Sequence, residues 1–327
     1  MLFAPFRRKS EGVATAGRQF CVQKNGMRTI RAVGEVSHSF LVKLLDNPEH
    51  LLWGESVHVV KEGRTSRLVR CTLPLNGMAV PVVYKRIRRR NWLKVLTGLF
   101  RESRAQRNWR LGHALLDSGI STPRPLVAVV PRFVGFGRDC FIATEWLEEA
   151  VSADSYLQQL RALNVIDRGE RLKAAARSLG VLLGKMHRHG FRHRDLKAQN
   201  VLLRVRSGKT ESFVIDLDGA AVAKYTNRSV RVRNLARLVI DLNADPLLSR
   251  TNRLVFISAY LREVGDPSWN WRRLWNALER ESSLLAIRKQ KHRKATTSAN
   301  SQEFIDPQIE EIAPTPALIR RDAARGL

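Results

Sequence analysis

Four polar residues near the middle of the chain have the types and spacing that phosphoryl transfer requires. Asp195 stands two residues before Lys197 and five before Asn200, and Asp216 follows in the sequence IDLDG. A carboxylate at Asp195 can accept or orient the proton of an acceptor hydroxyl, and Lys197 can offset charge on the moving phosphoryl group. Asn200 and Asp216 offer the hard oxygen ligands that Mg²⁺ prefers. The spacing therefore predicts Asp195 and Lys197 as catalytic residues and Asn200 and Asp216 as metal ligands.

A hairpin is expected to bring these residues together. Asn200 opens the apolar run VLL, the run SFVID leads into Asp216, and the polar segment RSGKTE lies between them as a turn. HRD or IDLD alone occurs by chance, but protein kinases have both in this order, as HRDLxxxN followed by a strand and DFG. Asp218 has two open roles, either assisting the metal or capping the turn at Gly219.

Nucleotide-binding residues are expected upstream of this hairpin. Lys85 ends the buried run VVYK, like the VAIK lysine that contacts the phosphates of ATP. Three runs predict strands, SVHVVKEG, RLVRCTL and AVPVVYKRI, and Gly63 in the turn GRTS is a minimal version of a phosphate-covering loop. Thr144 to Leu147 follow another predicted strand as the hinge, where Glu145 and Leu147 would bind adenine. The expected cofactors are ATP and Mg²⁺.

Two helices are expected to support the site. SRAQRNWRLGHALLDSGI predicts one helix, with Ser103 as its N-cap and Gly119 after its end. Protein kinases carry a lysine-pairing glutamate on this helix, but Asn108 stands there, and Glu102 lies six residues earlier, off the expected face. A weakly active or non-catalytic nucleotide-binding scaffold therefore stays open as an alternative. The second helix, ERLKAAARSLGVLLGKMHRHG, has apolar residues at helical spacing and ends at Gly190.

Two histidines flank the end of this second helix. His187 and His193 are interpreted as packing and backbone-bonding residues rather than as catalysts or metal ligands.

The charge of the chain is strongly positive. Lys and Arg number 57 against 30 Asp and Glu, which gives a formal net charge of +27. Such a surface attracts anionic lipid headgroups, phosphorylated glycolipids or nucleic acid. No RNP-like, KH or zinc-finger pattern is present, so specific nucleic-acid binding is not expected.

One basic segment, RIRRRNWLKVLTGLFRES, has apolar residues spaced for one helical face. It would either lie on an anionic membrane surface or pack on the rest of the protein. The apolar residues are Trp92, Leu93, Leu96, Leu99 and Phe100.

Cysteine content and hydropathy suggest the compartment. The three cysteines, Cys21, Cys71 and Cys140, are odd in number and far apart, so neither a disulfide framework nor a CxxC metal site is expected. No run approaches the ~20 apolar residues that span a bilayer. We expect a cytoplasmic monomer that is soluble or held peripherally on a membrane.

The segment after Gly219 points to the kind of acceptor. It passes quickly into the helix-like run RVRNLARLVIDLNADP and contains no APE sequence. Protein kinases use a longer activation segment here to bind the substrate peptide. A small or lipid-linked acceptor is therefore favoured, with an atypical protein Ser/Thr kinase as the alternative.

At this point the chain resembles the bacterial lipopolysaccharide core kinases, which phosphorylate Kdo or heptose and belong to the protein-kinase-like superfamily. The resemblance covers about Val57 to Leu261. It implies ATP- and Mg²⁺-dependent transfer to a sugar hydroxyl of a glycolipid core at the cytoplasmic face of the bacterial inner membrane. Its marks are VVYKRI, SRAQRNWRLGHALLDSGISTPRPL, HRDLKAQNVLL, FVIDLDGA, RVRNLARL and TNRLVFISAYL.

These observations predict an α+β, two-lobed, protein-kinase-like fold. Residues 46–147 would form a small β-rich N-lobe and residues 148–280 a larger, mainly helical C-lobe. Residues 1–45 are predicted to be a basic, partly disordered arm, with one short helix in VSHSFLVKLLDNP. Residues 281–327 mix charge, Ser/Thr and Pro and are predicted to be a disordered basic extension, in which IRKQKHRK could contact acidic lipid.

Overall fold

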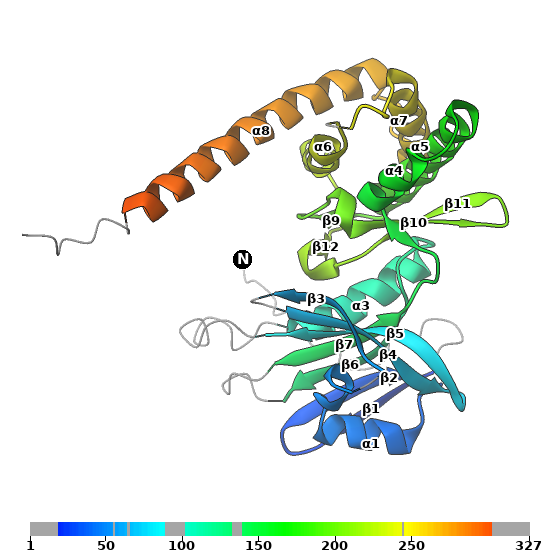
Figure 1. The fold of residues 1–327 in the computed structure, drawn as a ribbon, viewed down its shortest axis with the longest axis vertical. Coiled ribbons are helices and arrows are strands. Elements are labelled where there is room, and N and C mark those ends of the chain that lie inside the picture. The colour runs from blue at the N-terminus through cyan, green and yellow to red at the C-terminus, as the bar shows by residue number, and fades with distance from the viewer. Residues whose placement is uncertain are drawn as a thin grey trace, which may run out of the picture. The chain divides into compact units, whose positions relative to one another are not determined.

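The computed structural model describes residues 19–54, 56–63, 66–88, 102–132, 139–243 and 245–302. The residues up to Ser282 form one compact unit, and those from Ser283 on form another. The first unit contains a sheet-based N-lobe and a mainly helical C-lobe (Figure 1).

The N-lobe is built on a seven-stranded antiparallel sheet with the order β1-β2-β6-β7-β5-β4-β3. In β4 the buried residues Val69, Cys71 and Leu73 alternate with more exposed ones, as the period of a strand with one face in the core requires. The strands are β1 Phe20–Lys24, β2 Arg28–Val33, β3 His58–Gly63, β4 Ser66–Leu75, β5 Met78–Ile87, β6 Pro125–Pro131 and β7 Cys140–Glu145.

The N-terminal part of this lobe differs from the sequence prediction. A partly disordered arm is wrong for the part of residues 1–45 that forms β1 and β2, whereas the predicted short helix is confirmed as α1 (His38–Asp46). Ile30 and Leu44 are fully buried in the same core as Val69. The strand β2 has the sequence RTIRAV, in which two arginines three residues apart conceal the strand period. Residues 1–18 lie outside the described residues.

Helix α3 (Arg104–Asp117) packs on the sheet and lies between it and the β9–β12 pair of the C-lobe (Figure 1). The predicted caps are confirmed: the Ser103 side chain accepts a hydrogen bond from the Gln106 N–H, and Gly119 has a φ of +67°. The predicted amphipathic segment with Trp92, Leu93, Leu96, Leu99 and Phe100 falls in 89–101, outside the described residues.

The C-lobe combines helices with two small sheets, ordered β11-β10-β8 and β12-β9. Its helices are α4 Ala153–Leu160, α5 Val165–Arg188, α6 Arg228–Asn243, α7 Arg250–Val264 and α8 Trp271–Gln302. Short 3₁₀ helices occur in this lobe at η3 Ala198–Asn200 and η4 Leu217–Gly219, and in the N-lobe at η1 His50–Leu52. Its strands are β8 Val151–Ser152, β9 Phe191–His193, β10 Val201–Arg206, β11 Lys209–Val214 and β12 Ala220–Val222.

Helix α8 corrects the predicted C-terminal boundary. The sequence prediction placed disorder from residue 281, but α8 continues without a break to Gln302. The segment is rich in Leu, Ala, Arg, Lys and Glu, which have high helix propensity, and this local preference outweighs its polarity. Residues 303–327 lie outside the described residues.

Helices α5 and α7 approach each other closely at two glycines. A Cβ at Gly180 would lie 2.6 Å from the Phe256 carbonyl oxygen, and one at Gly184 would lie 2.5 Å from the Glu263 Cβ. The two helices therefore touch at the level of their backbones. This contact packs α7 against α5, which ends just before β9 and the loop that contains Asp195.

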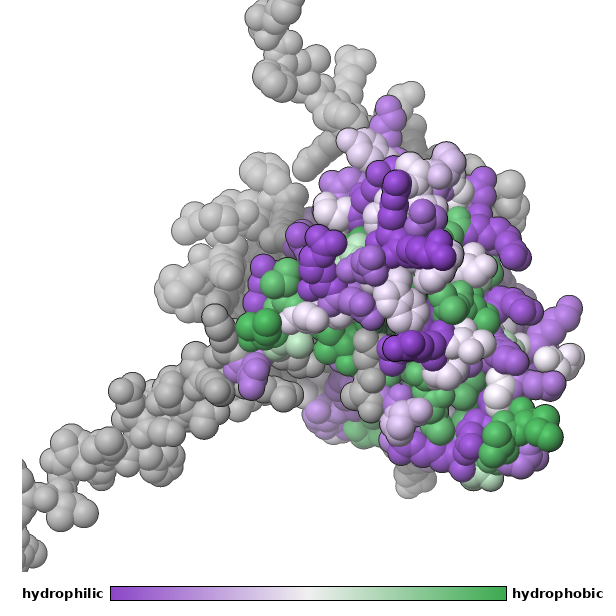
Figure 2. Space-filling view, turned by 90° about the horizontal axis from the view of Figure 1, so that it is seen from above, coloured by the Kyte–Doolittle hydropathy of each residue, from purple (hydrophilic) through white to green (hydrophobic). Residues whose placement is uncertain are grey.

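The surface seen from above, relative to the view of Figure 1, is largely hydrophilic and carries smaller groups of hydrophobic residues (Figure 2). Within the described ranges, no helix combines the length and the hydrophobicity that crossing a bilayer requires.

Candidate active site

The loop between β9 and η3 presents Asp195 to solvent. Its side chain is 58% exposed, and the Lys197 Nζ lies 3.1 Å from its Oδ2. The Asn200 Nδ2 donates to the Asp195 carbonyl oxygen at 2.7 Å and reaches the Oδ2 at 3.2 Å. The predicted catalytic residues are therefore neighbours, and Lys197 and Asn200 both contact the Oδ2 of a carboxylate that stays open to solvent.

Buried neutral groups hold this loop from below. The His193 N–H donates to the Asn234 Oδ1 at 2.7 Å, and the Asp195 N–H donates to the His193 Nδ1 at 3.2 Å. The His193 Nε2 must then carry the proton that it shares with the Asp216 carbonyl oxygen, 3.0 Å away. Burial lowers the pKa of His193 and keeps the ring neutral. The interpretation of His193 as a backbone-bonding residue is confirmed.

The two predicted metal ligands emerge at one end of the β10–β11 hairpin. The Ile215 N–H donates to the Asn200 carbonyl oxygen at 3.0 Å, which places Asn200 across from the residue before Asp216. Asp216 adopts the left-handed conformation, with φ 55° and ψ 62°, which Asp tolerates better than most residues. This backbone turn directs the chain from β11 toward Lys85.

The donor atoms of these residues fit Mg²⁺. The Asn200 amide nitrogen is directed at Asp195, and Asp216 is 39% exposed with its Oδ1 on Lys85. In the part of the chain that the structure describes, no hydrogen bond reaches the Asn200 Oδ1 or the Asp216 Oδ2. One carbonyl oxygen and one carboxylate oxygen are thus left to hold the ion, and phosphate oxygens and water would complete its shell.

Lys85 connects the two lobes. Its Nζ lies 2.7 Å from the Asp216 Oδ1 and 3.0 Å from the Asp218 Oδ2, and its side chain is only 15% exposed. Burial by itself would lower the pKa of Lys85, but the Asp218 and Asp216 carboxylates outweigh it and raise the pKa. The lysine is therefore a charged group near the end of β5 that contacts both carboxylates of the turn after β11.

Asp218 contacts helix α3 as well as Lys85. Arg104 donates to its Oδ2, the Asn108 Nδ2 donates to its Oδ1 at 3.0 Å, and the Arg107 Nη2 donates to its carbonyl oxygen at 2.9 Å. Neither arginine was predicted from the sequence as a residue of the site. Their spacing at i, i+3 and i+4 with Asn108 puts all three on one helical face, which is the signal that could have revealed them.

The remaining nucleotide-binding predictions fall at the ends of strands. The N–H groups of Glu145 and Trp146 donate to backbone carbonyls of Arg124 and Pro81, whereas no backbone carbonyl of the described residues accepts from the Leu147 N–H. In the part of the chain that the structure describes, the Leu147 N–H is thus available to a ligand. Gly63 ends β3, but residues 64 and 65 at the tip of its turn lie outside the described residues.

The site thus contains a lysine on a strand, an exposed aspartate in a loop, and an asparagine and an aspartate at a hairpin end, in the chain order of a kinase. A family model described as the lipopolysaccharide kinase (Kdo/WaaP) family matches residues 52–260. This chain belongs to that family. It is therefore a kinase, and the predicted family and enzyme class are confirmed.

Curated relatives and a solved structure agree with this membership. The chain is 27% identical over 195 residues to a 3-deoxy-D-manno-octulosonic acid kinase of Xylella fastidiosa strain M12, covering 58% of this chain and 71% of that protein. The same enzyme of strain 9a5c is 27% identical over 140 residues, 43% of this chain and 50% of that one. A structure of WaaP in complex with acyl carrier protein superposes with a TM-score of 0.51 and 24% identity, over 79% of this chain and 97% of that one. The predicted protein-kinase-like fold is confirmed.

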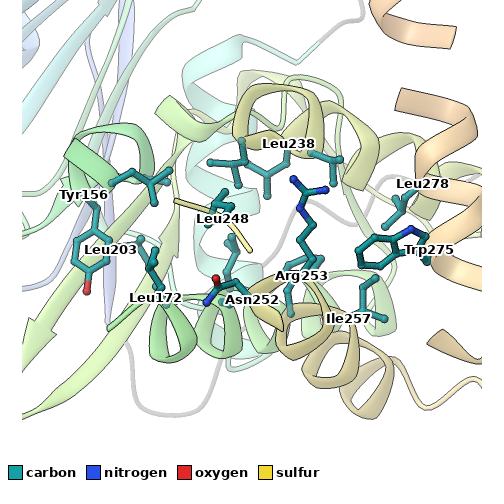
Figure 3. A pocket seen from close by; sticks show the side chains of 18 of the residues that line it. Tyr156, Leu172, Leu203, Leu238, Leu248, Asn252, Arg253, Ile257, Trp275 and Leu278 are labelled. Carbon is teal, nitrogen blue, oxygen red and sulfur yellow. The ribbon is translucent and has the colours of Figure 1, made fainter. Parts of the chain in front are cut away.

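A separate apolar cavity lies inside the C-lobe (Figure 3). Side chains from α4, α5, β10, α6, α7 and the start of α8 line it, and none of the predicted catalytic or metal-binding residues is among them. Arg253 extends among its apolar residues, and its Nε has no hydrogen-bond partner within the described residues. The labelled lining residues are Tyr156, Leu172, Leu203, Leu238, Leu248, Asn252, Arg253, Ile257, Trp275 and Leu278.

Proposed function

We propose that this kinase transfers the γ-phosphate of ATP to a sugar hydroxyl of the lipopolysaccharide core, with Kdo as the preferred acceptor. The observation that carries the proposal is the Asp195 carboxylate, which is exposed, held by Lys197 and Asn200, and placed in a chain whose curated relatives are Kdo kinases. Asp195 would accept the proton of the sugar hydroxyl as its oxygen attacks phosphorus. Lys197 would compensate charge on the phosphoryl group during transfer.

The other predicted residues would bind the nucleotide. Lys85 would contact the α and β phosphates, Gly63 would lie in the loop that covers them, and the Glu145 and Leu147 backbones would hold adenine. Asn200 and Asp216 would hold Mg²⁺, which neutralises phosphate charge when it is bound.

The charge around Asp195 favours an acidic acceptor. Burial, and then Arg233, lower the pKa of Arg237, whereas Glu281 and Asp195 oppose this shift. Arg237 therefore lies near Asp195, and Arg194 directly precedes Asp195 in the chain, whereas Arg233 pairs with Glu281. Kdo is an acid, whereas heptose is neutral, so a cationic surround would bind Kdo more tightly. A basic surface of this kind would also suit a peripheral position on an anionic membrane.

The direct test is transfer of labelled γ-phosphate from ATP to three acceptors: lipid A that carries only Kdo, a generic basic protein, and water. Label on the Kdo glycolipid that disappears in Asp195→Asn, but persists in the control Glu170→Gln, an exposed carboxylate of α5, supports the proposal. Label on the protein alone would indicate an atypical protein kinase. ATP binding without any transfer would indicate a non-catalytic scaffold.

A second candidate function, binding of an aliphatic chain, is favoured by the C-lobe cavity. Its lining is mostly apolar, with Asn252, Arg253 and Glu279 as polar members, and the Arg253 Nε, which has no hydrogen-bond partner within the described residues, would suit a carbonyl end group. The solved WaaP structure contains an acyl carrier protein, a protein that could bring such a chain. We propose that the cavity accepts an acyl chain. Binding of a fluorescent fatty acid should be lost in Ala176→Phe, which fills the cavity, and kept in Ala162→Phe on the surface. Equal binding of the fatty acid by both variants would contradict the proposal.

A further inference from the structure

The helix that faces Lys85 contains no glutamate. Helix α3 has the sequence RAQRNWRLGHALLD, and its single acidic residue is Asp117 at the far end. Glu102, just before the helix, forms an ion pair with Arg110 instead, whose Nη2 lies 3.0 Å from the Glu102 Oε2. The lysine–glutamate pair of protein kinases, which must form before their site is active, therefore has no counterpart on this helix.

A carboxylate from the other side of the site takes this position. Asp218 lies two residues after Asp216, is 14% exposed, and receives Lys85 at 3.0 Å. Arg104 shares the same carboxylate oxygen, and Asn108 donates to the second one. Both oxygens of Asp218 are thus used by Lys85 and α3, which leaves Asp216 as the more exposed carboxylate for a metal ion.

Two cations hold the Asp218 carboxylate in this position. The Lys85 Nζ lies 3.0 Å from its Oδ2, and Arg104 donates to the same oxygen. Removal of either cation would leave this buried carboxylate only partly compensated. Asn108 adds a neutral donor, and its Oδ1 has no partner in the described structure, so the amide serves this contact through its nitrogen.

We propose that Asp218 is the positioning residue for Lys85, and that it takes the place of the helix glutamate of protein kinases. The loop supplies the carboxylate, and the helix supplies Arg104 and Asn108 to fix it. Neither role that the sequence left open, metal ligand or turn cap, describes these contacts. When the phosphates of a nucleotide take Lys85 from Asp216, Asp218 keeps both the lysine and α3 in place. The inference rests on the proposed use of ATP by this kinase.

The test moves the carboxylate from the loop to the helix. Asp218→Asn should raise the KM for ATP at least tenfold. Asn108→Glu should do the same, because it sets a second carboxylate against Asp218. The double variant Asn108→Glu with Asp218→Asn should recover at least tenfold in kcat/KM over Asp218→Asn alone, because the longer glutamate can reach Lys85 from the helix. Glu102→Gln, which breaks only the exposed pair with Arg110, should leave the KM for ATP unchanged.

Two results would overturn the proposal. One is a KM for ATP that Asp218→Asn does not change, and the other is a double variant whose loss equals the product of the two single losses. Affinity for a fluorescent ATP analogue, measured alongside turnover and melting temperature, separates these results from unfolding. Wild-type protein that binds ATP but phosphorylates no glycolipid would contradict the proposed acceptor and leave the ATP-binding comparison of the variants valid.

Discussion

Different forces hold two neighbouring parts of the site, which are the Asp195 loop between β9 and η3 and the Lys85 cluster, made up of Lys85, Arg104, Asp216 and Asp218. Neutral hydrogen bonds from the buried groups His193, Asn200 and Asn234 hold the loop. Charges hold the cluster, where Lys85 and Arg104 compensate two carboxylates. The loop should therefore tolerate salt and fail when a buried partner is lost, whereas the cluster should fail when one charge is removed. The substitutions below test this contrast in order of decreasing effect.

The largest effect is expected at Asp195. Asp195→Asn removes the proton acceptor but keeps the size of the side chain, so kcat should fall by about 10²–10⁴. Because the carboxylate is exposed, the melting temperature should stay close to that of the wild type. Steady-state phosphoryl transfer and a thermal scan measure both quantities. A variant that keeps more than a tenth of the wild-type kcat would remove Asp195 from the chemistry.

The next effect is expected at Lys85. Lys85→Met deprives the nucleotide phosphates of a cation and should lower kcat/KM for ATP by about 10²–10³. In contrast to Asp195→Asn it should also lower the melting temperature, because the buried Asp218 carboxylate loses a partner. Lys61→Met, on the exposed strand β3, is the matched control and should change neither quantity. A stable, inactive Lys85→Met would show that the cluster does not depend on charge balance.

Loss of a neutral contact should act on stability first. Asn234→Ala leaves the buried His193 N–H without its acceptor and should cost about 1–3 kcal/mol of unfolding free energy. Urea denaturation measures this cost, with the exposed Gln158→Ala as control. The loss should be the same at low and high salt. A stability loss that depends strongly on salt would contradict the distinction between a loop held by neutral hydrogen bonds and a cluster held by charges.

Acid should weaken the neutral region before the charged one. His187 is fully buried against Tyr260, and burial lowers its pKa to about 3. The unfolded chain takes up this proton near pH 6.5, so unfolding becomes easier as the pH falls, by about 2 kcal/mol between pH 7 and 5. Burial would raise the pKa of Asp218, but Lys85 and Arg104 outweigh it and lower the pKa to about 2, so its contribution is full above about pH 4 and is lost as the pH falls from there toward 2. His187→Gln should flatten the stability profile between pH 7 and 5; an unchanged slope would contradict the assignment.

Contiguous motifs were predictable from the sequence, and contacts between distant segments were not. The Asp195, Lys197 and Asn200 loop and the strands around it lie within one short stretch, so their spacing alone places them. The partners of Asp218 lie on α3, more than 100 residues earlier, where nothing local indicates which carboxylate Lys85 meets. Strand β2 was missed for a related reason, because only its place in the sheet shows that its alternating residues face a core.

The close contact of α5 and α7 at Gly180 and Gly184 has a consequence for the C-lobe cavity. Both helices line it, so their separation fixes its width through backbone contacts that no side-chain rotation can relax. Related chains could exchange the lining residues, and so change which ligand would fit, without changing the distance between the two helices. A single methyl group at either glycine would instead push α5 and α7 apart and shift the helix that leads into the Asp195 loop. The ligand that this cavity would prefer can thus change while the packing of the two helices stays the same.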